Sequence, residues 1–239
     1  MLISGDVLSW SYRNENGSGL TDEEQDRIVR RAYKIWRHSN SLVSDDSSEF
    51  KLADAIVGLK RAVNHRLNTL TTSYALNALP FSSERKSLER LQHYGIIRPA
   101  ILKELFGIRN AIEHADHAPP SVNDCRRYVD FVWYFLKSTD SLLDMKLEDV
   151  IFWRDTEARS LRFCPNFDAG WNIEVSGNLL PADILQSWEP GAIGLDESIG
   201  RPSYRTPEIF GRWRPTSEQL CTFARTYFEL SGYPWDDHE

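Results

Sequence analysis

Cysteine is scarce in this sequence, and its spacing argues against two classes of site. The 239 residues include only three cysteines, Cys125, Cys164 and Cys221, which stand far apart. An odd number of distant cysteines without a C-x-x-C pair matches neither a disulfide framework nor a zinc ribbon. Reduced thiols in a cytoplasmic protein fit this pattern best, so we expect a cytoplasmic location.

Long apolar runs and several catalytic motifs are also missing. No stretch approaches the roughly 18 uncharged apolar residues needed to cross a bilayer, and the opening MLISGDVLSW lacks the regions of a signal peptide. We therefore expect a soluble, unsecreted protein with no membrane partner. The sequence contains no G-x-S-x-G, G-x-x-x-x-G-K-[ST], G-x-G-x-x-G or H-E-x-x-H motif. Serine hydrolase, nucleotide hydrolase, dehydrogenase and zinc protease functions are thus unsupported.

Positive charge is in the minority. Lysine and arginine number 28 against 35 acidic residues, giving a formal net charge of -7. This balance excludes a protein that coats nucleic acid by bulk attraction. The segment from Glu84 to Arg127 differs, because its eight basic residues outnumber its six acidic ones. A nucleic-acid site, if there is one, is therefore expected to be local.

Apolar residues spaced three and four apart predict helices between residues 20 and 145. One starts at Thr21, with Glu24 completing a capping box, and others run from about Ser83 to Tyr94 and onward from Pro99. The most regular stripe comprises Ile56, Leu59, Val63, Leu67, Leu70 and Tyr74.

The helix predicted after Ser121 is apolar on all sides in its middle. Phe131, Trp133 and Tyr134 add to a complete inward stripe. A helix without a polar side needs a second partner, which is either another domain or another subunit, and we expect a subunit. Beyond residue 147 the sequence changes to short runs of mixed apolar and polar residues, such as DVIFWRD and WNIEVSGN, which predict strands. A last helix is predicted near Thr216.

The segment ILKELFGIRNAIEHADHAPP carries the side chains best suited to catalysis. Its helical stripe is interrupted by Arg109, Asn110, Glu113, His114 and His117. Arginine suits phosphate and histidine exchanges protons near neutral pH, which suffices to cleave RNA because RNA supplies its own 2′-hydroxyl nucleophile. Arg109 and His114 are five residues apart, about 140° around a helix, so two copies of the helix are expected to form one pocket.

Arg109, Asn110 and His114, followed by a proline-containing turn and a long apolar helix, resemble the HEPN superfamily over roughly residues 50–145. Its signature is Arg, four to six residues, then His, commonly with a polar residue after the Arg. The resemblance implies a helical bundle that dimerises and, in many members, a metal-independent endoribonuclease of toxin-antitoxin or anti-phage defence systems. It further implies that Arg109 and His114 are catalytic, that Asn110 orients them, and that a 2′,3′-cyclic phosphate is left.

The sequence thus predicts a mainly α fold, with a HEPN-like helical bundle over residues 1–146 and a small α+β domain over residues 147–239. The expected partners are an RNA substrate, a second copy of the chain, and an antitoxin or regulatory protein. No cofactor and no metal are expected. The alternative is a catalytically inactive HEPN-like dimerisation module that engages a partner protein or nucleotide.

The same motif permits two further interpretations. Arg109 and Glu113 are spaced i, i+4 and would form a simple ion pair, with His114 favoured by the helix dipole. Glu113, His114 and His117, with Cys125, would instead be metal ligands, although no second ligand cluster completes such a site.

A second candidate for RNA contact lies in RPSYRTPEIFGRWRP. Its arginines alternate with aromatic residues, a pattern suited to contact with single strands; the alternative is an ordered loop whose arginines pack over aromatic faces. The predicted RNA-binding residues are Arg201, Arg205, Arg212 and Arg214. Trp171, Trp188 and Trp235 are expected in the core.

Overall fold

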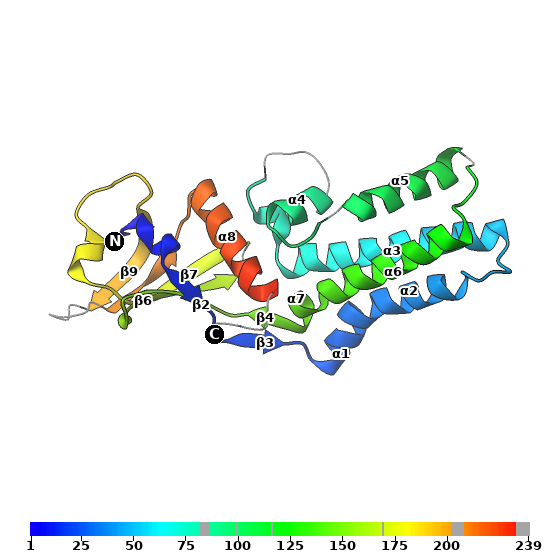
Figure 1. Cartoon of the computed structure of the whole chain (residues 1–239). Helices are drawn as coiled ribbons and strands as arrows, with labels where there is room; N and C mark the ends of the chain where they lie inside the picture. The colour runs from blue at the N-terminus through cyan, green and yellow to red at the C-terminus, as the bar shows by residue number, and fades with distance from the viewer. Residues whose placement is uncertain (82–86, 99, 116, 169, 202–207, 233–239) are drawn as a thin grey trace. The chain divides into compact units, whose positions relative to one another are not determined.

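The computed structural model describes residues 1–81, 87–98, 100–115, 117–168, 170–201 and 208–232. The chain divides into two compact units. The helical unit consists of Gly19–Ser73 and Glu84–Met145, and the sheet unit consists of Met1–Ser18, Tyr74–Ser83 and Lys146–Glu239 (Figure 1). The chain therefore passes between the units at several points instead of at one boundary.

The helical unit is built from the elements predicted between residues 20 and 145. In chain order they are α1 (Asp22–Gln25), η2 (Asp26–Arg30), α2 (Arg31–Ser41), α3 (Glu49–Ser73), α4 (Ser87–His93), α5 (Ala100–Ala115), α6 (Val122–Ser138) and α7 (Asp140–Asp144). The predicted capping box is confirmed, because the Thr21 hydroxyl accepts from the Glu24 N–H while the Glu24 carboxylate accepts from the Thr21 N–H. The segment η2 is a π-helical turn that leads directly into α2.

The core of the helical unit lies around α3. Its predicted stripe is confirmed, since Ile56, Leu59, Val63, Leu67 and Leu70 are all buried. Helices α2, α5 and α6 pack against α3, and α2 also packs against α6. The α2–α3 approach is close at Gly58, because a Cβ built there would lie 2.2 Å from the Ser39 Oγ. Glycine at this position therefore allows the two helices to pack tightly.

The sheet unit contains an eight-stranded sheet in the order β2-β5-β6-β7-β10-β9-β1-β8, whose neighbouring strands pair antiparallel. Its elements are β1 (Leu2–Ile3), η1 (Gly5–Ser9), β2 (Ser11–Arg13), η3 (Leu76–Ala78), β5 (Val150–Arg154), β6 (Thr156–Asn166), β7 (Asn172–Asn178), η4 (Pro181–Asp183), β8 (Ile184–Leu185), β9 (Ile193–Arg201), β10 (Glu208–Trp213) and α8 (Ser217–Gly232). A separate two-stranded sheet pairs β3 (Gly17–Gly19) with β4 (Met145–Leu147).

Aromatic side chains fill the space between the sheet and α8. Phe223 of α8 lies against Phe163 and Trp213, with ring centroids 5.6 and 5.7 Å apart. Tyr74, at the start of the inserted segment, joins this core, because the Trp171 indole N–H donates to the Tyr74 carbonyl at 2.7 Å and the Tyr74 ring contacts Tyr227. Burial of such large side chains supplies most of the driving force for this unit.

The prediction of a mainly α fold with only a small α+β domain is wrong. The eight-stranded sheet belongs to a unit that contains about half of the chain, and residues 1–18, which the sequence places in the helical bundle, supply β1 and β2. These strands have two and three residues, too few to show an alternating pattern. They form because distant strands pair with them: Leu2 pairs with Leu185 and Gly194.

Among the described residues, none of the helices combines the length and the apolarity that crossing a bilayer requires.

Candidate functional site

The predicted catalytic residues Arg109, Asn110 and His114 all lie on α5. This helix is anchored by its apolar side, where Leu102 and Leu105 are buried. It is also joined to α6, because the Tyr128 hydroxyl donates to the Glu104 carboxylate at 2.5 Å. Burial, and then this hydrogen bond, raises the pKa of Tyr128 to about 12, so the hydroxyl stays a donor at neutral pH. The polar residues of α5 are therefore carried on a fixed helix.

Arg109 is held by two neighbours on its own helix. Its Nη1 donates to the Asn110 Oδ1 at 3.1 Å, and its Nη2 forms an i, i+4 ion pair with Glu113. The Arg109 and Glu113 side chains are only 24% and 26% exposed. Asn110 thus contacts the guanidinium, and its role in orienting catalytic groups stays a prediction. The ion pair with Glu113 is the contact that the simpler interpretation of the motif predicts.

A second cation lies near Arg109. Lys60 of α3 has its Nζ 5.4 Å from the centroid of the Phe106 ring, one turn before Arg109. Partial burial, and then the charge of Arg109, lowers the pKa of Lys60. Glu113 pairs with Arg109, and Lys60 forms no ion pair among the described residues, so this part of α5 and α3 is suited to an anion once the Arg109–Glu113 pair opens.

His114 does not share this arrangement within one copy of the chain. It is exposed in the last turn of α5, and no hydrogen bond among the described residues joins it to Arg109 or Asn110. Their spacing places Arg109 and His114 about 140° apart around the helix. A single chain therefore does not bring the predicted acid-base group to the predicted phosphate group.

The metal-site interpretation of these residues finds no geometric support. Among the described residues, no group of three or more His, Cys, Asp and Glu side chains is placed to hold an ion. His117 is exposed, whereas Cys125 is buried and directs its thiol to the Pro120 carbonyl at 3.5 Å. Burial, followed by the nearby Asp124 charge, raises the pKa of Cys125 to about 11, which disfavours the thiolate that would bind metal.

The predicted RNA-binding arginines are only partly brought together. Arg212 and Phe210 lie on the exposed face of β10, while Trp213 faces the core. The cross-strand neighbours of Arg212 are Glu174 of β7 and Asp196 of β9. The positive charge of Arg212 is therefore offset by a carboxylate on each adjacent strand.

Of the remaining arginines of that segment, the structure describes the side chain of Arg214. Arg214 is exposed and forms an ion pair with Asp196. Arg201 lies in β9, but its side chain is outside the described residues, as is all of Arg205. RNA contact at this surface stays a prediction.

Helix α6 has the expected inward stripe and an exposed aromatic residue. Tyr134 is 64% exposed, and its ring lies 5.0 Å from that of the half-buried Trp133. Phe131 is also half-buried. The middle of α6 therefore presents aromatic surface outside the core of its own unit.

Family models, curated proteins and solved structures gave no match to this chain. The assignment of its chemistry therefore rests on its own residues.

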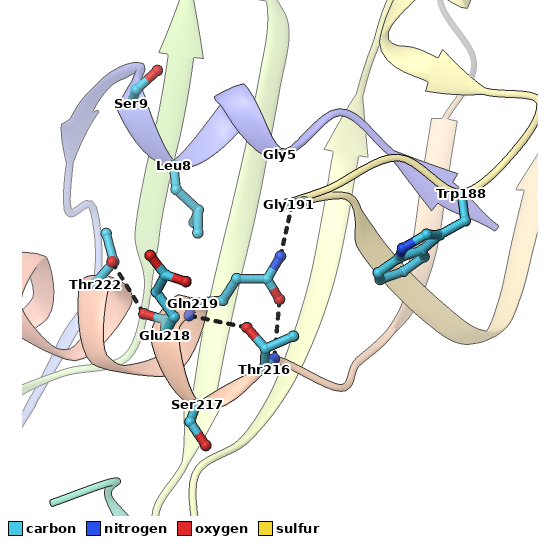
Figure 2. A pocket seen from close by; sticks show the side chains of 10 residues that line it. All are labelled: Gly5, Leu8, Ser9, Trp188, Gly191, Thr216, Ser217, Glu218, Gln219 and Thr222. Atoms are coloured by element: carbon cyan, nitrogen blue, oxygen red, sulfur yellow. Dashed lines mark hydrogen bonds between the residues drawn. The ribbon is translucent and has the colours of Figure 1, made fainter.

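One cavity in the sheet unit was not foreseen from the sequence. It is open to solvent and has a volume of about 720 Å³ beside the first turn of α8, and its wall includes η1 and the loop that carries Trp188 and Gly191 (Figure 2). The prediction that Trp188 lies in the core is wrong, because this side chain is 61% exposed at the cavity. Trp171 is buried as predicted, and Trp235 lies outside the described residues.

The wall of this Trp188 cavity is fixed by short contacts. The Gln219 side-chain amide donates to the carbonyls of Gly191 and Ala192 at 2.7 and 3.1 Å, and its oxygen accepts from the Thr216 N–H at 3.0 Å. A Cβ added at Gly5 would lie 2.0 Å from the Gly191 carbonyl oxygen, so glycine is required for η1 to approach this loop. The sequence gives no sign of this arrangement, because Gly5 and Gly191 are far apart in the chain.

Proposed function

We propose that this protein is a metal-independent endoribonuclease of the HEPN type, which acts as a homodimer in a prokaryotic toxin-antitoxin or anti-phage defence system. The observation that carries the proposal is the geometry of α5. There Arg109 is hydrogen-bonded to Asn110, Lys60 lies nearby, and His114 is accessible one turn later. An antitoxin or regulatory protein would restrain such an activity in its own cell.

The proposed reaction is a transesterification within the RNA. The 2′-oxygen attacks the adjacent phosphorus, the bond to the 5′-oxygen breaks, and a 2′,3′-cyclic phosphate and a 5′-hydroxyl are formed. His114 accepts the proton of the 2′-hydroxyl, and a proton is returned to the leaving 5′-oxygen. Arg109 stabilises the negative charge that builds on the phosphoryl oxygens, once its guanidinium leaves Glu113.

In this proposal the homodimer is needed to complete the catalytic site. Because Arg109 and His114 point about 140° apart on one helix, one phosphate is reached by both only if two copies of α5 face each other. The exposed Tyr134 of α6 supports such an association, since aromatic side chains are enriched at interfaces. Each site would then combine the Arg109 of one copy with the His114 of the other.

The test is RNA cleavage by the purified protein in the presence of EDTA. Wild-type protein is expected to cleave transfer or messenger RNA, whereas Arg109→Ala and His114→Ala should each lower the rate by about 100-fold or more, as expected for loss of acid-base or charge stabilisation. Intact RNA with wild-type protein at micromolar concentration, free of any inhibitor, would refute the proposal. Cleavage abolished by EDTA would also refute it, in favour of a metal-dependent enzyme.

Matched variants control for nonspecific effects. Arg127 is exposed on α6 and forms an i, i+3 ion pair with Asp124, so Arg127→Ala removes a comparable arginine from the same unit. His38 is exposed near the end of α2, so His38→Ala removes a comparable histidine. Both controls should retain wild-type cleavage.

A second candidate function is a catalytically inactive module that binds a nucleotide or a partner protein. The Arg109–Glu113 ion pair and the Trp188 cavity favour it, because the first occupies the guanidinium and the second offers an exposed indole beside hydroxyl groups. It predicts nucleotide binding that is lost in Trp188→Ala and kept in the control Trp153→Ala, whose indole is exposed on β5. Equal binding by the two variants would refute this candidate.

A further inference from the structure

The helical unit contains a small cavity away from the motif on α5. It is open to solvent, has a volume of about 350 Å³, and lies between the π-helical turn η2 and the last turns of α3. Apart from Ile28, it is lined by six polar side chains: Arg27, His65, Asn68, Thr69, Thr72 and Ser73. Each of these can donate a hydrogen bond and none is a carboxylate. We call this the α3 cavity.

The lining follows from local structure. His65, Asn68, Thr69 and Thr72 stand at i, i+3, i+4 and i+7, so they form one polar stripe along α3. Arg27 comes from the π-helical turn, a rare conformation that is frequent at functional sites. The cavity thus joins a row of polar side chains on α3 to one arginine.

His65 has an unused hydrogen-bonding atom. Its Nδ1 is buried without a hydrogen-bond partner in the described part of the chain. Thr69 does not satisfy it, because the Thr69 hydroxyl donates instead to the His65 carbonyl at 2.9 Å. A buried ring nitrogen without a partner is costly unless a bound group completes it.

Positive charge surrounds this histidine. Burial lowers the pKa of His65, and the charges of Arg31, Arg66 and Arg61 lower it further. Arg66 is neutralised by Asp140, whereas no salt bridge to Arg31 or Arg61 occurs among the described residues. An anion in the cavity would therefore meet an excess of positive charge.

Two carboxylates close to Arg27 in the sequence are occupied elsewhere. Glu24, whose carboxyl feels the charge of Arg27, accepts hydrogen bonds from the Thr21 N–H and hydroxyl at 3.1 and 2.8 Å. Asp26 accepts from the Lys34 ammonium at 2.9 Å. Neither carboxylate lines the cavity.

From this geometry we infer that the α3 cavity binds the phosphate group of a phosphomonoester. Arg27 provides a planar guanidinium, His65 provides a ring nitrogen, and the amide and hydroxyl groups of Asn68, Thr72 and Ser73 complete a set of donors for the phosphate oxygens. The size suits a phosphate with part of the group that it esterifies, near the lower end of ligand cavities. The inference is independent of any reaction at Arg109 and His114.

The test uses the full chain and measures the pKa of His65 by NMR, with His65→Gln to assign its signal. Sulfate is the first probe, because it remains a dianion across the titration. Sulfate at matched ionic strength should raise the pKa of His65 by about 1 unit relative to chloride, as an opposite charge beside the ring favours the protonated form. The exposed His38 should show no comparable rise.

Variants and ligands then decide the site and the ligand class. Arg27→Gln should remove most of the sulfate effect on His65, whereas Arg37→Gln, an exposed position on α2, should not. Adenosine monophosphate should reproduce the sulfate effect and adenosine should not. An unchanged His65 pKa, an equal shift at His38, or equal effects in the two arginine variants would each overturn the inference, as would adenosine acting as well as its monophosphate.

Discussion

Arg66 and Asp140 form a two-point ion pair inside the helical unit, with Nη1 and Nη2 of the arginine each 2.9 Å from one carboxylate oxygen. Arg66 is fully buried on α3 and also donates to the Leu136 carbonyl and the Thr139 hydroxyl at 3.2 and 3.1 Å. Asp140 is less buried, and it accepts in addition from the Tyr33 hydroxyl at 2.7 Å. The pair therefore fixes α3 to the junction of α6 and α7.

The two halves of this ion pair should differ in their effect on stability. Asp140→Asn leaves the buried Arg66 charge without its anion, so we expect a loss of about 3 to 5 kcal/mol. Arg66→Met should cost less, because Asp140 keeps Tyr33 and the Lys137 ammonium as partners. Urea unfolding of the purified variants measures the difference. Arg126→Met, which breaks the exposed pair with Asp45, should change stability by less than about 1 kcal/mol.

Two glycine substitutions should change the stability of the protein in opposite directions. Gly107 lies in the middle of α5, and nothing is within 4 Å of a Cβ built there, so Gly107→Ala should stabilise by about 0.5 to 1 kcal/mol. A Cβ at Gly5 would meet the Gly191 carbonyl oxygen at 2.0 Å, so Gly5→Ala should destabilise by about 1 to 3 kcal/mol. Thermal unfolding gives both values, and equal shifts would contradict this reading of the packing.

The sequence was informative where a pattern is local and long. The stripe from Ile56 to Leu70 repeats over several helical turns, so α3 could be predicted with its buried face. The capping residues Thr21 and Ser121 act on backbone three residues away, and both caps are present. Strands β1 and β2 could not be predicted, because their short sequences acquire a conformation only by pairing with β9, β8 and β5.

The candidate sites likewise differ in whether local sequence spacing or the tertiary fold determines them. The Arg109–Glu113 pair follows from a spacing of four on one helix. In contrast, the polar stripe containing His65 has the sequence pattern of a solvated helix face. Only the fold shows that η2 lies beside it. The sequence wrongly predicts Trp188 in the core for a related reason, because its exposure depends on the path of the loop between β8 and β9. The net charge around Arg212 could not be predicted either, because it depends on the strand register that places Glu174 and Asp196 beside it.

The pKa of His65 has a consequence for stability. The ordinary value is 6.5, and burial followed by nearby arginines lowers the pKa in the folded state. Below that ordinary value the unfolded chain binds the proton more readily than the folded one, so stability falls as the pH drops below about 6.5 and levels off below the folded pKa. Urea unfolding at several pH values should show this loss in wild type. It should be reduced in His65→Gln and unchanged in the exposed control His38→Gln.

Tyr134 should contribute to the proposed homodimer. Tyr134→Lys places a charge on the exposed aromatic surface of α6, and we expect the dimer affinity to fall by at least about tenfold, as for an aromatic residue central to an interface. Asn123→Lys adds the same charge at an exposed position near the start of α6 and should leave the dimer intact. Light scattering over a range of concentrations measures both. A dimer unaffected by Tyr134→Lys would show that α6 is not its interface.

Glu113 is the residue whose substitution should separate the two proposed functions. In the nuclease proposal its carboxylate competes with RNA phosphate for the Arg109 guanidinium, so Glu113→Gln should raise RNA affinity by about two- to fivefold, equivalent to an ion pair of up to about 1 kcal/mol. The gain should weaken as salt increases, because phosphate contacts release counterions. In the inactive-module proposal the ion pair is only structural, and RNA affinity should not change. Fluorescence anisotropy with a labelled RNA measures the affinity, and Asp124→Gln, which frees Arg127 on α6, is the matched control.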